Sequence, residues 1–361
     1  MKILITGSKG FVGSNLVERL SREGHTLLTF DVDNTIDELD SLINEADFIF
    51  HLAGVNRPKD TKEFGVNSSL TETIISLMKK NNKDIPIVFT SSTQVLLDNE
   101  YGKSKKEAED LLLNGNLQAY VCRCPNLFGK WCRPNYNSVI ATFCYNIAHN
   151  IEISVNKEAS PITFLYIDDL LDFFMEILKG NVEKGLITDF PVTYRSTPCE
   201  IADILKGFRD SRTNFNIPFQ VGFTAKLYAT YLTYLEPSDF SYDVIPHIDD
   251  RGSFTELYKT PGFGQTSVNV IKPGITKGNH YHHTKNEKFI VLSGECEIKF
   301  RKINTNDVIS IKTSGNCVKI VDIIPGYTHS ITNIGKSDAV VLMWASQLFD
   351  PEHPDTYFEE V

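Results

Sequence analysis

The sequence predicts an α/β fold with a doubly wound parallel sheet in the first two thirds of the chain, followed by an all-β barrel. Up to about residue 240, short apolar runs alternate with helical patterns, which is typical of a parallel sheet covered by helices on both faces. A glycine-rich turn stands directly after the first apolar run. Beyond about Ser241, alternating β segments are separated by Gly, Asn and Pro turns and show hardly any helical pattern.

The N-terminal elements follow this alternation in order. The run KILITG is a short strand, a glycine turn opens an amphipathic helix, and HTLLTFD is a second strand. The pattern continues through ADFIFHLAG, a helix near residues 70–80, the strand PIVFTSS and a helix over residues 102–113. After the helical TAKLYATYLTYL, the prolines, serines and acidic residues of EPSDFSYDVIP indicate a boundary. We therefore expect two domains, residues 1–242 and 243–361, each large enough for its own core.

The composition excludes several classes of function. The 361 residues carry a formal net charge of −10 and have a pI near 5.4. Binding to nucleic acid or to an anionic membrane needs a basic face, so we expect neither partner. Seven cysteines without a CxxC pair indicate free thiols in a reducing compartment. We find no signal-peptide pattern and no apolar run of transmembrane length, so we expect a cytoplasmic protein without membrane insertion.

The glycine turn indicates a site for a phosphate-bearing cofactor. Gly7, Gly10 and Gly13 stand between the first strand and its helix, which is the context that a dinucleotide motif requires. Glycines let the backbone approach a pyrophosphate, which then lies against the N-terminal amides of the helix. Asp31 ends the second strand, where an acidic residue binds the adenosine ribose 2′-hydroxyl and repels the extra phosphate of NADP. Asp31 by itself therefore favours NADH.

A tyrosine and a lysine one helical turn apart indicate reduction chemistry. In the segment YGKSK, Tyr101 and Lys105 lie on the same helix face, so the ammonium can lower the phenol's pKa and make it a proton donor. Ser91, Ser92 and Thr93, at the end of the preceding strand, can place a hydroxyl beside this phenol, with Ser92 and Thr93 as the catalytic candidates. A YxxxK on an exposed helix is usually solvated surface. Together with SST and the glycine turn, in this order, it predicts a dinucleotide-dependent oxidoreductase.

With these motifs the first two thirds of the chain resembles the extended short-chain dehydrogenase/reductase family, which has a Rossmann-like fold. The segments HLAG, RCPNLFG and FLYIDD are further matches. The resemblance implies a nucleotide-sugar substrate, with Asn126 near its diphosphate and with Lys130 and Arg133 as anion partners. We expect Asp168 and Asp169 to open a helix rather than to act in catalysis. The cofactor-binding residues that the resemblance implies are Gly7, Gly10, Phe11, Val12, Gly13, Asp31, Leu52, Ala53, Gly54 and Lys105.

The segment PGITKGNHYHHTKNEKFIVLSG, which starts at residue 273, has the spacing of a metal site. His280 and His282 are two residues apart in a strand, so both can reach one ion inside a barrel while Tyr281 faces away. Glu287 follows, and the later segment PGYTH supplies His329. Such nitrogen and oxygen ligands suit a divalent transition ion, with Zn²⁺ first and iron, manganese and nickel open. The alternative is a metal-free barrel whose histidines are buried hydrogen-bonding groups.

This arrangement resembles the two-motif pattern of the cupin superfamily, small β barrels that often hold a metal between three histidines and a glutamate. The first motif matches at every spaced position. The second departs from the pattern, because Ile324 stands at the usual proline position and the upstream glycine is missing. The resemblance implies a metal held by His280, His282, Glu287 and His329.

Both halves together resemble a family of bifunctional capsular-polysaccharide enzymes of the UDP-N-acetyl-L-fucosamine pathway. Stretches that carry the resemblance include HLAGVNRP, DDRGSFTE and DPEHPDTYFEEV. It implies that the cupin domain epimerises C3 of UDP-2-acetamido-2,6-dideoxy-4-hexulose, and that the first domain then reduces the C4 ketone with NADPH. The product would be UDP-2-acetamido-2,6-dideoxy-L-talose. Both family types commonly pair, so we expect a homodimer.

The residues leave two other interpretations open. In one, the C-terminal domain is a dimerisation or ligand-binding module attached to a working reductase. In the other, the first domain is a 4-epimerase or dehydratase that retains NAD, and Asp31 gives this interpretation weight. The sequence assigns no epimerising base, and the candidates by position alone are Tyr281, His283, Lys288 and Tyr327.

Overall fold

The computed structural model describes residues 1–156, 158–217 and 221–361, and it divides the chain into two compact units. The first comprises Met1–Leu205 and Gly222–Leu235, and the second comprises Lys206–Val221 and Glu236–Val361. The helix α7 (Pro198–Asn214) contributes residues to both. In the described part of the chain, no helix combines the length and the apolar character needed to span a bilayer.

A parallel six-stranded sheet forms the centre of the first unit, in the order β2-β1-β3-β4-β5-β8. Its strands are β1 (Lys2–Thr6), β2 (Thr26–Phe30), β3 (Phe48–His51), β4 (Ile87–Ser92), β5 (Ala119–Cys124) and β8 (Gly185–Ile187). From β1 the chain moves to β2 on one side and then returns to β3 on the other. The strand order therefore reverses between β1 and β3, and ligands of such sheets bind outside the carboxyl ends of the strands at this reversal.

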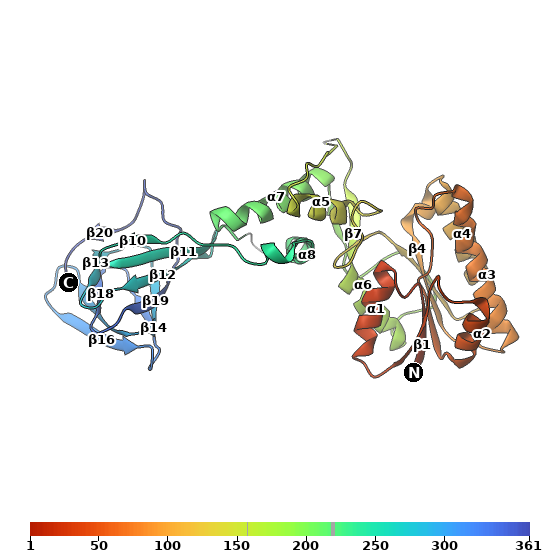
Figure 1. Cartoon of the computed structure of the whole chain (residues 1–361), viewed down its shortest axis with the longest axis horizontal. Helices are drawn as coiled ribbons and strands as arrows, with labels where there is room; N and C mark the ends of the chain where they lie inside the picture. Colours follow the sequence, from red (N-terminus) through yellow and green to blue (C-terminus); the bar gives the residue numbers. More distant parts are fainter. Residues whose placement is uncertain (157, 218–220) are drawn as a thin grey trace. The chain divides into compact units, whose positions relative to one another are not determined.

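Helices cover both faces of this sheet, as Figure 1 shows. Because successive strand residues point to opposite faces, Ile3 and Ile5 pack with Leu16 on one side, whereas Leu4 packs with Leu39 on the other. The first face is covered by α1 (Phe11–Ser21) and α6 (Ile167–Leu178), and the second by α2 (Ile36–Glu45), α3 (Gly65–Lys80) and α4 (Glu100–Leu113). The predicted doubly wound α/β domain is confirmed.

A smaller three-stranded sheet also belongs to the first unit. Its order is β6-β7-β9, and an aromatic cluster of Phe128, Phe164 and Phe223 packs beside it with ring centroids 5.6–6.2 Å apart. This cluster ties α8 to β6 and β7. The remaining elements of the unit are β6 (Asn126–Phe128), β7 (Ile162–Tyr166), β9 (Tyr194–Ser196), α5 (Val139–Ala148), α8 (Gly222–Leu232), η1 (Thr61–Phe64) and η2 (Thr93–Leu96).

Two antiparallel sheets form the second unit, which confirms the predicted all-β domain. The core between them consists of apolar side chains from both sheets, such as Phe289 and Val291 from β14 and Ile298 and Phe300 from β15. A short turn, η3 (Pro237–Asp239), precedes the sheets. One sheet has the order β10 (His247–Asp249), β11 (Gly252–Thr260), β12 (Gly264–Ile271), β19 (Ala339–Ala345), β14 (Glu287–Ser293) and β17 (Ile320–Ile323). The other has the order β16 (Val308–Ser314), β15 (Glu295–Lys302), β18 (Tyr327–Asn333), β13 (Thr276–Tyr281) and β20 (Tyr357–Phe358).

Candidate active site and metal centre

A cavity of about 540 Å³ opens at the carboxyl ends of β1, β3, β4 and β5. This is where the reversal in strand order places a ligand. Most of the residues predicted for cofactor binding, catalysis and substrate binding in the first domain line this cavity. They are Gly7, Gly10, Phe11, Val12, Gly13, Leu52, Gly54, Ser92, Thr93, Tyr101, Lys105, Asn126 and Arg133.

The glycine turn forms a cradle that side chains would fill. Gly7 has a φ of 70°, and a Cβ at this position would lie 2.7 Å from the Cα of Ala53. A Cβ at Gly13 would overlap the carbonyl oxygen of Gly7. Gly10 is the N-cap of α1, and no side chain caps this helix, so its first amides are left for a ligand. The residues therefore fit the pyrophosphate of a dinucleotide cofactor.

Tyr101, Ser92 and Lys105 meet at one wall of the cavity. The sequence predicts a lowered pKa for Tyr101, but burial raises it to about 12, and only the hydrogen bond with Ser92 lowers it in part. Burial lowers the pKa of Lys105 to about 8. The Lys105 ammonium donates to the backbone carbonyl of Thr90 at 3.0 Å. Thr93 also lines the cavity, but it is exposed, and the hydroxyl bonded to the phenol is that of Ser92.

The local sequence fixes the phenol beside this hydroxyl. The side chain of Asn99 caps α4 by accepting a hydrogen bond from the amide of Gly102 at 2.7 Å. A Cβ at Gly102 would overlap the carbonyl oxygen of Gln94, so glycine lets the first turn of α4 pack directly on η2. Tyr101 lies in that turn, and Ser92 is the residue that caps η2.

Two residues predicted for the site, Lys130 and Ala53, do not line the cavity and contact other groups instead. The ammonium of Lys130 donates to Asp168 at 2.8 Å and lies over the ring of Trp131. The backbone amide of Ala53 donates to Thr6 at 3.3 Å, so Ala53 supports the glycine turn from behind.

Asp31 lies beside the glycine turn and also stands outside the cavity lining. Its carboxylate accepts hydrogen bonds from the backbone amides of Lys9 at 2.7 Å and Val32 at 2.9 Å. The ammonium of Lys9 pairs with Asp33. Lys9 itself lines the cavity, so a cation stands next to the acidic residue that the sequence singles out.

Sequence reasoning missed several side chains of this cavity. Trp131 is the largest of them: 55% of its surface is exposed, and its φ of 67° is unusual for a bulky residue. No spacing rule marks such positions, because the fold alone brings them to the cavity. The others include Asn56, Gln94, Cys124 and Tyr136.

In the second unit the four predicted metal ligands come together. His280, His282, Glu287 and His329 each offer one ligand atom, and these atoms all lie within 4.8 Å of one another. His280 belongs to β13 and His282 follows that strand directly, with the two ring centroids 5.0 Å apart. Glu287 begins β14, whose alternation buries it together with Phe289. His329 lies on β18 opposite His280.

The donor atoms of this cluster fit a divalent metal ion. Nε2 of His282 and both ring nitrogens of His329 are buried without a hydrogen-bond partner among the described residues. Nε2 of His282 lies 3.4 Å from Oε2 of Glu287, and Nε2 of His329 lies 3.7 Å from the same oxygen. Burial lowers the pKa of His329 to about 3, which keeps its imidazole neutral as a ligand must be. Three nitrogens and a carboxylate suit a transition ion.

A second cavity, of about 290 Å³, reaches this cluster at Glu287. Lys285 lines it, with Nζ 3.8 Å from Oε1 of Glu287. No motif in the sequence marks this lysine. Apolar and polar side chains share the rest of the wall, among them Phe254, Glu256, Gln265, Met343 and Trp344.

All four side chains proposed by position as epimerising bases have other contacts, and Tyr327 packs against the apolar core of the second unit. Tyr281 stacks on Tyr357 with ring centroids 5.3 Å apart, and His283 lies 4.9 Å from the same ring. Lys288 forms an ion pair with Asp322.

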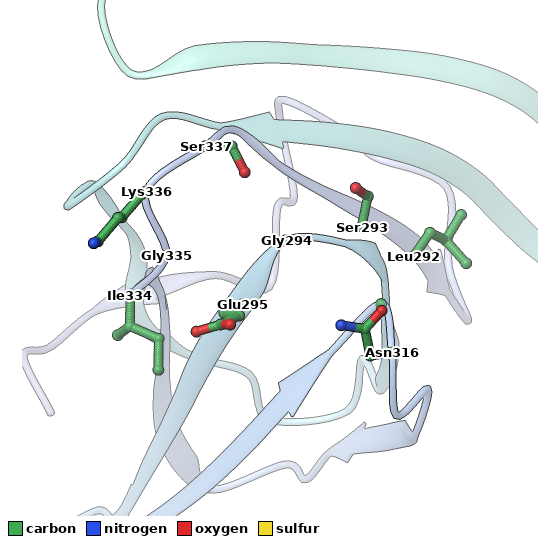
Figure 2. Close-up of a pocket in the computed structure, with 10 residues that line it drawn as sticks. Leu292, Ser293, Gly294, Glu295, Asn316, Ile334, Gly335, Lys336 and Ser337 are labelled. Carbon is green, nitrogen blue, oxygen red and sulfur yellow. The ribbon is translucent and has the colours of Figure 1, made fainter.

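A third hollow, of about 480 Å³, lies among turns of the second unit (Figure 2). Its wall consists of residues 292–295 and 334–337 with Gly315 and Asn316. Figure 2 shows Ser293, Glu295 and Ser337 around it. This hollow includes none of the predicted site residues.

Comparisons with known proteins agree with this two-part organisation. Residues 3–187 match the NAD dependent epimerase/dehydratase family, and residues 247–357 match the polysaccharide biosynthesis C-terminal domain. The chain is 44% identical to UDP-2-acetamido-2,6-beta-L-arabino-hexul-4-ose reductase of Pseudomonas aeruginosa, over 99% of this chain and 98% of that protein.

Solved structures give the same result. The capsular polysaccharide assembling protein CapF of Staphylococcus aureus superimposes with a TM-score of 0.92 at 48% identity, over 100% of both chains. UDP-N-acetylglucosamine 4-epimerase of Bacillus cereus matches 65% of this chain and 99% of its own with a TM-score of 0.52 at 20% identity, which shows a shared fold alone. The chain is therefore an enzyme that belongs to the NAD dependent epimerase/dehydratase family and carries a polysaccharide biosynthesis C-terminal domain.

Proposed function

We propose that this enzyme has two active sites that act in turn on one UDP-linked 4-keto sugar. The second unit, as a metal-dependent cupin, epimerises C3 of UDP-2-acetamido-2,6-dideoxy-4-hexulose. The first unit reduces the C4 ketone with NADPH, giving UDP-2-acetamido-2,6-dideoxy-L-talose for surface polysaccharide synthesis. The observation that carries the proposal is the Ser92, Tyr101 and Lys105 set at the cavity beside the glycine cradle. The reductase of Pseudomonas aeruginosa, similar over the whole chain, supports the substrate class.

The reduction step uses the three side chains in distinct roles. A nicotinamide cofactor held at the glycine cradle would supply the hydride for C4. The hydroxyls of Ser92 and Tyr101 hydrogen-bond the C4 oxygen, and Tyr101 gives it a proton as the carbonyl becomes an alcohol. The ammonium of Lys105, buried nearby, favours the phenolate that remains on Tyr101. The uncapped backbone amides at the N-terminus of α1 hold the pyrophosphate of the dinucleotide.

The choice between NADPH and NADH depends on the residues around the adenosine end. Asp31 disfavours a 2′-phosphate, whereas Lys9 offers a cation to it once the ammonium leaves Asp33. We propose NADPH as the cofactor, with NADH as the alternative. The test is the ratio of kcat/KM for the two cofactors in the parent and in a Lys9→Gln variant. If Lys9 serves NADPH, the variant loses kcat/KM for NADPH and keeps it for NADH.

Epimerisation requires a proton to leave C3 and another to return on the opposite face. The electrons of the broken C–H bond move toward the C4 carbonyl, so negative charge develops on its oxygen. A divalent ion, Zn²⁺ first, would stabilise that charge when it is held by the three histidines and Glu287. Lys285 stands at the same cavity and offers a second positive group.

Deuterium exchange separates the two activities. The purified protein is incubated with the UDP-4-keto-6-deoxy sugar in heavy water without cofactor, and incorporation at C3 is followed by NMR or mass spectrometry. A blank without protein corrects for exchange that occurs in solution, and a chelator-treated sample shows whether the exchange needs the metal. NADPH or NADH is added afterwards, and its oxidation is measured.

The variants assign each activity to its site. His282→Ala and Glu287→Ala should lose C3 exchange and keep reduction of a sugar that is already epimerised. Tyr101→Phe should keep exchange and lose reduction by about 10²–10⁴-fold. If the two metal-site variants exchange C3 as fast as the parent, the second unit is a binding or dimerisation module. If Tyr101→Phe abolishes both activities, the division between the sites is wrong.

An NAD-retaining 4-epimerase or dehydratase would give a different result. Such an enzyme holds its cofactor through the cycle, so the purified protein would release NAD on denaturation and would consume none during turnover. Stoichiometric oxidation of added NADPH excludes this interpretation.

A further inference from the structure

One carboxylate near the end of the chain holds the turn that joins two of the metal ligands. Asp355 accepts hydrogen bonds from three consecutive backbone amides, those of His283 at 3.0 Å, Thr284 at 2.9 Å and Lys285 at 2.8 Å. The hydroxyl of Thr284 donates to the same carboxylate at 2.8 Å. Residues 283–285 stand between His282 and Glu287, so this carboxylate fixes the segment that sets the separation of these two ligands.

The backbone of Asp355 acts on one ligand directly. Nδ1 of His282 donates to the carbonyl oxygen of Asp355 at 2.7 Å, across 73 residues of sequence. With its proton on Nδ1, the ring of His282 directs an unprotonated Nε2 toward Oε2 of Glu287, 3.4 Å away. A carbonyl partner of this kind fixes the tautomer and the orientation of a metal-bound histidine.

The conformation of Asp355 is itself uncommon. Its φ is 40°, in the region that L-residues other than glycine, asparagine and aspartate rarely adopt. The bonds of the carboxylate and of the carbonyl together hold the residue there. A residue in such a conformation, bonded through both its side chain and its backbone beside a cluster of donor atoms, is what a functional constraint produces.

We propose that Asp355 is a positioning residue of the metal centre, which clamps the turn between His282 and Glu287 and fixes the His282 tautomer. This inference rests on the proposed metal site but not on the epimerase reaction. The segment that carries Asp355 thus holds two ligands in position, although it provides no ligand to the cluster itself.

The test measures metal affinity in three variants of the full chain. In Asp355→Ala all side-chain bonds to residues 283–285 are lost, whereas Asp355→Asn keeps an oxygen that can accept some of them. Asp350→Ala is the matched control, because this exposed acid of the same segment also accepts a backbone amide, that of Glu352 at 2.9 Å, yet does not contact the cluster. Zn²⁺ affinity is obtained by competition with a chromophoric chelator, and the visible spectrum of bound Co²⁺ reports the coordination geometry.

We expect Zn²⁺ to bind about 10–100-fold more weakly to Asp355→Ala, as for other outer-shell partners of metal ligands. Asp355→Asn should give an intermediate loss, and Asp350→Ala should bind as the parent does. The Co²⁺ spectrum should change in Asp355→Ala alone or most. Equal affinity and an unchanged spectrum in Asp355→Ala would overturn the proposal. Should that variant fail to fold, parental affinity in Asp355→Asn with an unchanged spectrum overturns it equally.

The results also separate this inference from the proposed function. If the parent binds neither ion, both the positioning role and the metal centre are wrong, while the reductase proposal is unaffected. If the parent binds metal, Asp355→Ala binds it weakly and the parent shows no C3 exchange, the positioning role stands and the epimerase assignment fails.

Discussion

The hydroxyl of Ser91, which lines the cavity of the first unit, donates to Oε1 of Glu109 at 2.7 Å, and Glu109 has no exposed surface. Arg123 donates two hydrogen bonds to the same carboxylate, from Nε at 2.8 Å and from Nη2 at 2.6 Å. This network joins the end of β4 to α4 and β5. It commits Ser91 to the fold, whereas its neighbour Ser92 is the hydroxyl bonded to the phenol of Tyr101.

Two adjacent serines should therefore respond in opposite ways to the same change. We expect Ser92→Ala to lower kcat for reduction by about 10²–10³-fold, as for the loss of one donor to a developing oxyanion. Its unfolding free energy should fall by only about 0.5–1 kcal/mol, because the side chain also caps η2. Ser91→Ala should keep kcat within a few-fold and lower the unfolding free energy by about 1–3 kcal/mol, because it removes a hydrogen bond to a buried charge. Oxidation of NADPH and denaturant unfolding measure the two effects. If Ser91→Ala is the slower enzyme, the roles are reversed.

The sequence predicts the parts of both sites that depend on local spacing. Tyr101 and Lys105 are one turn apart on a helix, and His280 and His282 are two residues apart at a strand, so their geometry follows from regular secondary structure. The glycine turn is predictable for the same reason, since a strand and a helix flank it. The division of the fold into an α/β part and an all-β part follows from the period of the apolar pattern.

The rest depends on contacts that the chain makes only after folding. Lys130 has the charge of an anion partner, but its ion pair with Asp168 joins residues 38 positions apart, and no local pattern reveals it. Trp131 reaches the cavity through a backbone conformation that sequence does not specify. Asp355 accepts a hydrogen bond from His282 across 73 residues of sequence. Family resemblance draws attention to the segment DPEHPDTYFEEV, but it does not predict this contact.

Lys105 should give the reduction a pH dependence. Burial holds its pKa at about 8, below the value of about 10.4 for an exposed lysine, and the proposed mechanism needs the charged form. We expect kcat/KM for NADPH, which reports the enzyme before it binds cofactor, to fall as the pH rises through about 8. The exposed Lys103 of the same helix provides the control, because Lys103→Gln should show the same fall of kcat/KM as the pH rises through about 8. A profile that stays flat well above pH 8 would contradict the role of Lys105.

The same ionisation should appear in stability. The unfolded chain binds a proton on Lys105 more tightly than the folded chain does, so between about pH 8 and about pH 10.4 the unfolded state carries more protons. The contribution of Lys105 to the unfolding free energy therefore becomes more favourable as the pH rises through this window. Comparing parent and Lys105→Met in denaturant unfolding at several pH values isolates that contribution, which should disappear in the variant.

The glycine cradle should tolerate no methyl group at Gly13. A Cβ there would overlap the carbonyl of Gly7, so Gly13→Ala must move the turn away from α1. We expect weaker cofactor binding, seen in a fluorescence titration with NADPH, together with a lower unfolding free energy. Gly65→Ala is the control, because among the described residues its added Cβ meets nothing within 4 Å apart from its chain neighbours and its own helix backbone, and its φ of −57° is helical. That change should leave cofactor binding intact and raise stability by up to about 1 kcal/mol.

Each candidate site contains one of the two tryptophans of the chain, so each site can be observed separately. Trp131 lines the cavity of the first unit, and Trp344 lines the cavity beside the cluster of three histidines and Glu287. In Trp344→Phe the remaining emission should be quenched by NADPH and by UDP, because Trp131 is exposed at the cavity where both are expected to bind. In Trp131→Phe the emission of Trp344 should respond to Zn²⁺ and to the UDP-4-keto sugar instead. Trp344→Phe also loses the bond from Nε1 to the carbonyl of Phe263 at 3.1 Å, so its fold is checked by thermal unfolding. Epimerisation at C3 requires the ketosugar to enter the cavity that the Trp344 indole lines. A Trp344 signal that responds to metal but never to the ketosugar would therefore favour a second unit that binds an ion without turning over substrate.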